Sequence, residues 1–451
     1  MRFFRFRDRG ATPAARPESG GHEPDADDNP VGADAEASTD DDPELQAPPD
    51  AEGDDDAHWR RRAAAAIVGS ASTGSKRPEA LYGDGPPTLP THFVRAAGCQ
   101  LTTAGGDSLT DCTMALGAVA LGYADSHVTG RVVDAVAAGN VAGLSHVMEV
   151  EVAERLCDVI PCAETVRFLK TGAEAVAAAV RIARSATGRS RVIGSGYFGW
   201  LGWWTGAAGV PAGVHADYTP VAFDDVAQLE QAAGEAGSDL AAIVLEPVVE
   251  RLPSPEWIAA ARAACDRVGA VLVFDEVKTG FRLRTGGYQE YAGVTPDLAT
   301  FGKAMANGFP LAAVVGRAAV MDAAAATWIS STLAGESTAL AAASAVLDWH
   351  EKADVCESLW SVGRDMRAGV AAAATQSGVD GVRVDGIDPM WLIRFDDPKR
   401  QSRFLELALR EGVLFKRGAY NFASLAHDER ALLQVERAAS TAFVELVEEG
   451  A

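Results

Sequence analysis

The sequence predicts an α/β fold in which a mainly parallel sheet lies between layers of helices, with a smaller α/β unit near the C-terminal end. After residue 165, short apolar runs alternate with stretches of helical spacing. Such alternation is typical of a parallel sheet with helices on both faces. One helix has clear end signals, because Ser254 and Pro255 fit its N-cap and first position and Gly269 fits its end. The stretch 382–451 repeats strand and helix patterns on a smaller scale.

The elements that precede the main sheet follow from local composition. Residues 58–65 have helical spacing, whereas the Gly-, Ser- and Pro-rich stretch 69–86 predicts a long loop. Between residues 92 and 112, short apolar runs alternate with turn residues, which indicates a small hairpin. Residues 124–140 and 148–160 place Val, Leu and Ile on one side at helical spacing, so both stretches predict helices.

Short apolar runs predict the strands of the main sheet. These runs are 166–170, 191–194, 241–246, 270–275, 297–301 and 311–316. An alanine-rich helix over 337–350 follows them, and the chain closes with a helix over 427–448. We therefore expect an N-terminal segment over 58–120, a large domain over 121–345 and a small C-terminal domain over 346–451.

The first 57 residues differ in composition from the rest of the chain. They hold 5 basic and 17 acidic residues, whereas residues 58–451 hold 35 and 46. Residues 21–57 contain no Lys or Arg and almost no large apolar side chain. Such a stretch cannot bury enough surface to offset its chain entropy. We therefore expect residues 1–57 to form a disordered acidic tail.

Composition also disfavours several classes of partner and compartment. The chain has no run of 18 apolar residues that would predict a transmembrane helix, and residues 1–9 lack the apolar core of a secretory signal. The acidic balance disfavours nucleic acid. Six scattered cysteines without a CxxC pair indicate free thiols in a reducing compartment, and the eight histidines lack metal-binding spacing. We expect a cytoplasmic protein with no metal site and no membrane or nucleic-acid partner.

Three polar groups lie at the carboxyl ends of predicted strands, where ligands bind in parallel sheets. The turn KTGAEA (170–175) offers helix N–H groups to a phosphate, although many such turns are only structural. Asp275 follows a buried strand, where a carboxylate can also cap a helix or form a salt bridge. Lys303 lies between two buried strands, where it must be paired, be neutral or extend to solvent. Together they meet the needs of pyridoxal phosphate (PLP): a phosphate site, a lysine that binds the cofactor and an acid for its ring nitrogen.

Several motifs resemble those of the class III aminotransferases of PLP fold type I, in the branch that contains glutamate-1-semialdehyde aminomutase. The segments FDEVKTGFR (274–282) and FGKAMANGFPLAAVVG (301–316) are close to the family's patterns, and KTGAEAVAAAVRIAR (170–184) is similar to its phosphate loop and helix. STLAGESTALAAA (331–343) is similar to the segment whose threonine reaches the phosphate of the neighbouring subunit, and NFASLAH (421–427) is similar to the C-terminal domain.

The resemblance implies a role for each matching residue. Lys303 would be the Schiff-base lysine and Asp275 the partner of the ring nitrogen, which makes these two the catalytic residues. The other implied cofactor contacts are Gly172 and Ala173 at the phosphate, Tyr197 and Val277 on the two ring faces, Glu246 near the ring, and Thr332 at the other protomer's phosphate. The role of Thr332 implies a homodimer with shared active sites.

The sequence departs from the aminomutase in two loops. Phe198 stands where a histidine usually follows the tyrosine, and the chain between Tyr197 and GVP (209–211) is shorter than the aminomutase's mobile lid. In the N-terminal loop, Ser75 stands where the aminomutase has an arginine for the substrate carboxylate, and Lys76 or Arg77, one or two positions further on, would have to substitute for it.

These features predict a PLP-dependent aminotransferase that moves an amino group from an amine donor to a carbonyl acceptor, both small molecules. An intramolecular aminomutase of the glutamate-1-semialdehyde type is the alternative. A non-catalytic binding module of the same fold is disfavoured, because Lys303 and Asp275 are both present. A lysine-dependent aldolase of another fold would need neither the phosphate turn nor Asp275.

Overall fold

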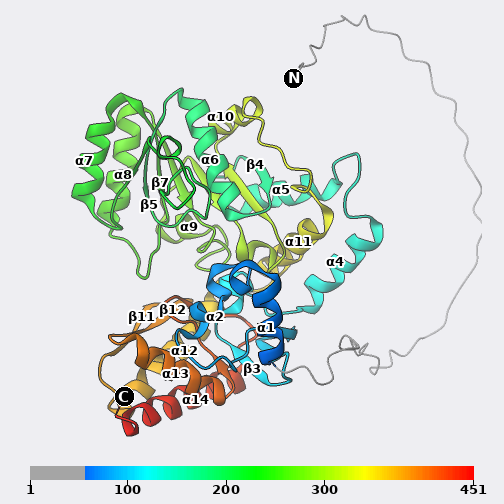
Figure 1. Cartoon of the computed structure of the whole chain (residues 1–451). Helices are drawn as coiled ribbons and strands as arrows, with labels where there is room; N and C mark the ends of the chain where they lie inside the picture. Colours follow the sequence, from blue (N-terminus) through cyan, green and yellow to red (C-terminus); the bar gives the residue numbers. More distant parts are fainter. Residues whose placement is uncertain (1–55, 451) are drawn as a thin grey trace, which may run out of the picture. The chain divides into compact units, whose positions relative to one another are not determined.

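A seven-stranded sheet forms the centre of the part of the chain that the computed structural model describes, residues 56–450 (Figure 1). Its strands, in spatial order, are β4 (Thr165–Leu169), β10 (Ala312–Gly316), β9 (Leu298–Phe301), β8 (Val271–Asp275), β7 (Leu240–Leu245), β5 (Arg191–Ser195) and β6 (Tyr218–Pro220). Strands β9, β8, β7, β5 and β6 run parallel, whereas β10 is antiparallel to both of its neighbours. The predicted mainly parallel sheet is confirmed, and the reversed strand β10 is a feature that the sequence did not indicate.

Helices cover both faces of this sheet because its strands are apolar on both sides. The covering helices include α6 (Gly172–Thr187), α7 (Val226–Ala236) and α8 (Pro255–Val268). In β7, Ala242 and Val244 belong to the core beneath α6, whereas Ile243 and Leu245 belong to the core beneath α7 and α8. Figure 1 shows α6 on one side of the sheet and α7 and α8 on the other. Full burial of an Ile or Leu side chain contributes about 1.5–3 kcal/mol, so these layers hold the strand ends in place.

The predicted end signals of α8 are confirmed. The Ser254 side chain accepts a hydrogen bond from the N–H of Trp257, and Pro255 occupies the first helical position. Gly269 ends the helix with a φ of 67°, a left-handed conformation that a side chain would strain.

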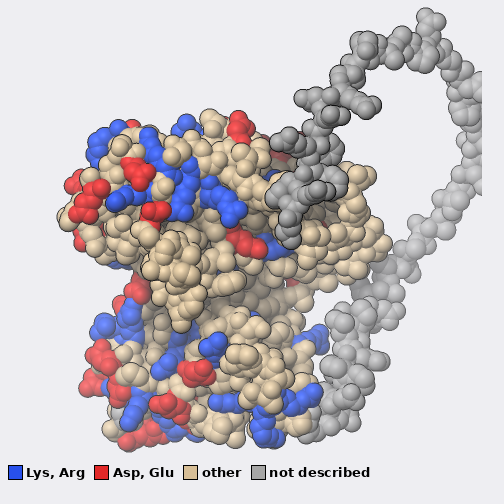
Figure 2. Space-filling model, turned by 45° about the horizontal axis from the view of Figure 1, so that its top comes forward, with Lys and Arg blue, Asp and Glu red and all other residues tan. Residues whose placement is uncertain are grey.

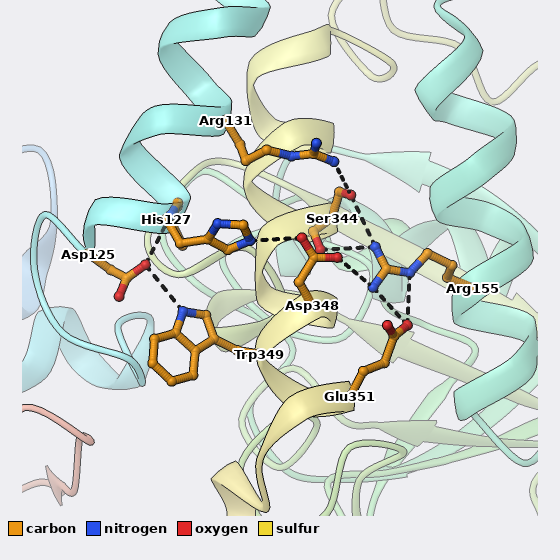
Figure 3. Close-up of polar contacts among 9 residues, drawn as sticks. Asp125, His127, Arg131, Arg155, Ser344, Asp348, Trp349 and Glu351 are labelled. Carbon is orange, nitrogen blue, oxygen red and sulfur yellow. Dashed lines mark hydrogen bonds and ion pairs between the residues drawn. The ribbon is translucent and has the colours of Figure 1, made fainter. Parts of the chain in front are cut away.

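Helix α11 (Ser337–Lys352) is joined by polar side chains to α4 (Ser126–Ala138) and α5 (Val147–Val159) (Figure 3). His127 of α4 lies 2.8 Å from Asp348 of α11, and Arg155 of α5 lies 3.0 Å from the same carboxylate. Arg155 also lies 2.8 Å from Glu351. Burial acts to raise the pKa of Asp348, but the His127 hydrogen bond and the Arg155 charge hold it below its usual value. The network therefore holds α4 and α5 against α11. The residues that connect α4 to α5 line a second cavity, described below.

The N-terminal segment builds a small sheet that the C-terminal part of the chain completes. Its elements are α1 (Asp56–Ala66), α2 (Pro78–Tyr82), β1 (Phe93–Ala97), β2 (Gln100–Thr103), β3 (Ser108–Asp111) and α3 (Met114–Gly117). The predicted hairpin is a three-stranded antiparallel unit, to which β13 (Val413–Leu414) adds a strand parallel to β3. The stretch 69–86, predicted to be a loop, contains α2 because Pro78 fits a first helical position.

Two short helices, α9 (Tyr288–Ala292) and α10 (Ala318–Met321), lie in the segment that carries the main sheet. The C-terminal part of the described chain holds α12 (Val355–Ser377), β11 (Val382–Ile387), β12 (Met390–Phe395), α13 (Pro398–Arg410), β14 (Asn421–Phe422) and α14 (Glu429–Glu448). Strands β11, β12 and β14 form a third sheet. Its core includes Phe404 and Phe443, whose ring centroids lie 4.5 Å apart. The 23-residue helix α12 was not identified from the sequence.

The surface and the chain termini place few constraints on the function of the protein. The predicted tail, residues 1–57, lies outside the described residues except for its last two positions. Figure 2 shows Lys and Arg interspersed with Asp and Glu on the face that it draws. Within residues 56–450, no helix combines the length and the apolar character needed to cross a bilayer. All six cysteines are unpaired, and five of them are buried.

Candidate active site

A cavity of about 330 Å³ lies at the carboxyl edge of the main sheet. Asp275 is the last residue of β8, and Lys303 follows β9 directly after Gly302. The two strands are parallel and Asp275 lies opposite Thr300, so both strand ends reach the same edge. Seven of the eight residues implied to hold PLP line this cavity: Gly172, Ala173, Tyr197, Glu246, Asp275, Val277 and Lys303.

Asp275 is a buried carboxylate, only 5% exposed. Its Oδ1 atom accepts hydrogen bonds from the backbone N–H of Val277 and the hydroxyl of Thr300, each at 3.1 Å. Burial, and then the nearby Glu246 carboxylate, raise the pKa of Asp275 to about 7. A positively charged group placed against this carboxylate would stabilise its ionised form.

Lys303 has an unusual backbone and a weakly basic amine. Its φ of 47° is left-handed, which is uncommon for a residue other than glycine. The side chain of Asn307 holds the turn that follows, because it accepts the N–H groups of Ala120 and Leu121 and donates to the carbonyl of Gly122. Desolvation, and then the Lys278 ammonium, lower the pKa of Lys303 to about 8. A fraction of this amine is therefore unprotonated near neutral pH.

The start of helix α6 presents two open N–H groups to the cavity. The Thr171 side chain caps the N–H of Glu174, and the Glu174 carboxylate accepts the N–H groups of Lys170 and Thr171. Among the described residues, this leaves the N–H groups of Gly172 and Ala173 without an acceptor. The first turn of a helix with free N–H groups is suited to a phosphate.

Two side chains form walls beside these groups. Val277 packs closely on Gly172, since a Cβ atom added at Gly172 would lie 2.9 Å from a Val277 methyl carbon. Tyr197 is 67% exposed, and its backbone N–H donates to Oε2 of Glu246 at 3.2 Å. Phe198 is buried and stacks on Trp203, so the usual histidine position is occupied here by a core residue that also reaches the cavity.

Two further lysines line the cavity, and sequence reasoning did not select them as site residues. Lys278 lies 2.6 Å from Oε1 of Glu246, and Lys170 lies 2.7 Å from Glu336. Lys170 is the last residue of the predicted strand 166–170, and Lys278 follows the predicted strand 270–275 by three residues; this position at a strand end was the signal available in the sequence. Among the seven lysines, three therefore converge on one edge of the sheet.

Thr332 lies apart from the other predicted residues within this chain. It is exposed and lines a second cavity, of about 390 Å³, together with residues 139–146 between α4 and α5. The Lys170–Glu336 ion pair joins the two sites, because Lys170 lines the first cavity and Glu336 the second.

The N-terminal loop also lies apart from Lys303. Lys76 lines a third, mostly apolar cavity with Tyr82, Asp111 and Tyr123. The carbonyl of Ser75 accepts a hydrogen bond from Lys416. Among the described residues, those that line the Lys303 cavity include none from 69 to 77.

The groups around the first cavity fit PLP. The open N–H groups of α6 suit its phosphate, Asp275 suits its ring nitrogen, and the weakly basic Lys303 suits its aldehyde. The close contact of Gly172 with Val277 leaves no room for a side chain where the ring and phosphate would approach the helix. A parallel α/β sheet with these groups at its carboxyl edge is suited to a PLP-dependent enzyme.

The chain belongs to the class-III aminotransferase family, whose model matches residues 82–201 and 209–427. It is therefore a PLP-dependent enzyme that catalyses transamination, as the motifs predicted. The unmatched residues 202–208 fall in the loop after Tyr197.

Solved structures share this fold over most of the chain. The FumI protein of a Sphingopyxis species, in its PLP internal aldimine form, is 26% identical with a TM-score of 0.82, covering 88% of this chain and 97% of its own. An omega-transaminase from Sphaerobacter thermophilus is 24% identical with a TM-score of 0.77, covering 88% and 98%. A glutamate-1-semialdehyde aminomutase from Pseudomonas aeruginosa is 20% identical with a TM-score of 0.75, covering 87% and 94%. The likeness to the last two concerns the fold.

Proposed function

We propose that this protein transfers an amino group from a separate amine donor to a carbonyl acceptor, with Lys303 and Asp275 as its catalytic residues. One observation supports this most directly: both side chains line a single cavity at the start of α6. When bound there, PLP supplies an electron sink for the carbon that carries the amino group.

The cofactor contacts follow from the chemistry of the cavity wall. The N–H groups of Gly172 and Ala173 would hold the phosphate, and Asp275 would hold a proton on the ring nitrogen. Val277 and Tyr197 would cover the two faces of the ring, with Glu246 close to it. These contacts would fix the reacting carbon beside Lys303.

Lys303 would act as the base and acid for the substrate. Its Nζ atom, with a pKa lowered to about 8 by desolvation and the Lys278 charge, can take a proton from the substrate carbon and return it. The left-handed backbone at Lys303 is the kind of local strain that active sites retain when function requires it.

The test of this assignment is a panel of amines. Purified holoenzyme is mixed with each amine, and the absorption of the bound cofactor is followed as it converts to the amine form. Conversion with at least one amine is expected. A wild-type enzyme that binds PLP but responds to no amine in a broad panel would contradict the proposal.

Transfer between two molecules is favoured over intramolecular transfer by the loops. An aminomutase must retain its intermediate while nitrogen moves within one substrate, and the loop after Tyr197 is short for a lid. None of the residues 69–77 lines the Lys303 cavity, and Ser75 cannot grip a carboxylate as an arginine does. We expect weak conversion of glutamate-1-semialdehyde to 5-aminolevulinate. Strong conversion without an added donor would establish the aminomutase alternative instead.

A homodimer with shared active sites is part of this proposal. Thr332 is exposed, and so are the apolar side chains of Val141 and Leu144, which line the same cavity, and of Trp328 and Leu333, which are close to it in sequence. Exposed apolar patches are typical of protein interfaces. In a dimer, Thr332 of one protomer would reach the phosphate bound by the other.

Subunit mixing tests the shared site. Lys303→Ala and Thr332→Ala proteins are each expected to have low activity. A mixed dimer would contain one site with Lys303 from one chain and Thr332 from the other, so refolding the two together should restore activity. Mixtures that gain nothing over the sum of their parts would contradict the role of Thr332.

The domain division and the compartment are proposed on simpler grounds. We assign residues 58–120 to an N-terminal segment, 121–345 to the PLP-binding domain and 346–451 to the small C-terminal domain. The six unpaired cysteines favour the reducing cytoplasm. Limited proteolysis and cell fractionation test these two assignments.

A further inference from the structure

Lys278 brings a second ammonium group into the wall of the Lys303 cavity. Its Nζ atom lies 2.6 Å from Oε1 of Glu246, and the two side chains are 8% and 13% exposed. The same Nζ lies 3.4 Å from the hydroxyl of Tyr420 and 4.4 Å from the centre of its ring. Lys278 is therefore a desolvated cation with one carboxylate partner.

Glu246 is itself held in place. Its other oxygen, Oε2, accepts the N–H of Tyr197 at 3.2 Å. Its Cβ packs against Gly196, where an added Cβ atom would lie 2.4 Å away. The carboxylate consequently stays beside the cavity, where its charge acts on Asp275.

A buried ion pair of this kind is weak evidence for stability, because desolvation of both charges offsets their attraction. Its position gives it another use, since all four charged side chains, Lys278, Glu246, Asp275 and Lys303, line one cavity. Two carboxylates in one desolvated site compete for ionisation, and so do two ammonium groups.

We propose that Lys278 is a positioning residue for amino transfer: its ammonium neutralises Glu246, which leaves Asp275 ionised, and it disfavours a second positive charge on Lys303. This inference rests on the roles proposed for Asp275 and Lys303. Lys278 would act through the charges of those residues and would need no contact with the substrate.

The charges that face this group come from several elements. Glu246 follows β7, Asp275 ends β8, Lys303 follows β9, and Tyr420 precedes β14. Arg282, after β8, adds positive charge near Lys303. After burial, Glu246 is the main cause that raises the pKa of Asp275, and Lys278 is the main cause that lowers the pKa of Lys303. The directions of both pKa shifts agree with the positions of these charged side chains around one cavity.

The experiment is a spectroscopic pH titration of the cofactor bound to purified holoenzyme. The variants are Lys278→Met, Lys278→Arg, Glu246→Gln and the double variant Lys278→Met with Glu246→Gln. In Lys278→Met, loss of the cation leaves Glu246 unneutralised. The pH midpoint of the cofactor's absorption change should therefore move upward by about one pH unit, the scale of a charge interaction in a partly desolvated site. Lys278→Arg should keep the wild-type midpoint, and the double variant should return toward it.

If Lys278 served only for packing, the midpoint shifts of the two Lys278 variants would rank in the opposite order. The methionine side chain is close to lysine in length and apolar, so it would disturb packing least, whereas the larger arginine would disturb it most. Lys352→Met, on exposed surface outside the cavity, is the matched control for loss of one positive charge and should leave the midpoint unchanged.

The outcomes separate this inference from the proposed function. Borohydride reduction and peptide mapping locate the cofactor in each variant. If the cofactor is on Lys303 but the titration midpoint of Lys278→Met does not move, only the role of Lys278 is refuted. The same holds if the midpoint of Lys278→Arg shifts as far as that of Lys278→Met. Cofactor on another lysine would refute the proposed function and this inference with it.

Discussion

Replacing Asp275 with asparagine should make the apoenzyme more stable at pH 8 and the enzyme less active. The Oδ1 atom of Asp275 accepts hydrogen bonds from the Val277 N–H and the Thr300 hydroxyl. An asparagine oxygen can accept both, so the substitution removes a buried charge and little else. The Lys303 charge acts to lower the pKa of this carboxyl group, but burial and the Glu246 charge outweigh it.

The magnitude follows from the pKa of Asp275, which burial and Glu246 raise from 3.8 to about 7. A raised carboxyl pKa gives stability that is fully present below the unfolded value and is lost as the pH rises toward the folded value. A difference of about 3 units, at about 1.4 kcal/mol each, means that ionised Asp275 destabilises the folded apoenzyme by up to about 4 kcal/mol at pH 8 relative to pH 4. Asp275→Asn should not show this loss.

The assay is urea unfolding of both apoenzymes at pH 5 and pH 8. The difference in unfolding free energy in favour of Asp275→Asn should be larger at pH 8 than at pH 5, because Asp275 of the folded wild-type protein ionises across this range. With PLP bound, a protonated ring nitrogen would compensate the charge, so the advantage of the variant should shrink. Turnover of the variant should fall by at least about a hundredfold, the scale for loss of one electrostatic stabiliser.

Asp297→Asn is the matched control. Asp297 is buried to a similar degree, but it accepts hydrogen bonds from Arg262 and Arg317. Loss of its charge should destabilise the protein at both pH values, since two cations lose their partner. If the Asp275→Asn gap were equal at pH 5 and pH 8, or if this variant were less stable than wild type at pH 8, the reasoning about Asp275 would be wrong.

Three further changes have simple expected outcomes. Lys303→Ala should abolish turnover and leave the fold intact by circular dichroism; borohydride label on any of the other six lysines in wild type would count against the assignment. Gly172→Ala should weaken PLP binding about tenfold, or about 1.4 kcal/mol, because the added Cβ atom would push Val277 and the start of α6 out of the positions that face the cofactor; an unchanged dissociation constant in a fluorescence titration would show that the helix start does not approach the cofactor. Removal of residues 1–55 should leave cofactor content and turnover unchanged, since their composition offers little apolar surface; a large loss of either in the purified protein would contradict this.

The sequence by itself determined the architecture and the chemical class of the site. Alternating apolar runs and helical patterns were enough for the mainly parallel sheet, because both signals are local and depend on burial of one face or both. The turn at Gly172, Asp275 and Lys303 were identifiable because each lies at the end of a predicted strand, and parallel strands bring their carboxyl ends to one edge.

Other features depend on contacts between distant residues, and local patterns carry no information about them. The reversed strand β10 lies between β4 and β9, and β13 completes the N-terminal sheet some 300 residues away, so pairing rather than composition decides both positions. Thr332 matched the family motif, yet only the folded chain shows that it lies in a different cavity from Lys303.

Lys278 illustrates the same limit at the level of charge. Its sequence position resembles that of any lysine after a strand, and an ammonium there can extend to solvent or pair with a neighbour. The tertiary structure decides between these outcomes, because Glu246 from β7 and Tyr420 from the C-terminal part meet its Nζ atom in a desolvated wall. The sequence determined which ionisable groups are available, and the structure determined which of them share a low-dielectric space, where the interaction between charges is strong enough to set their protonation.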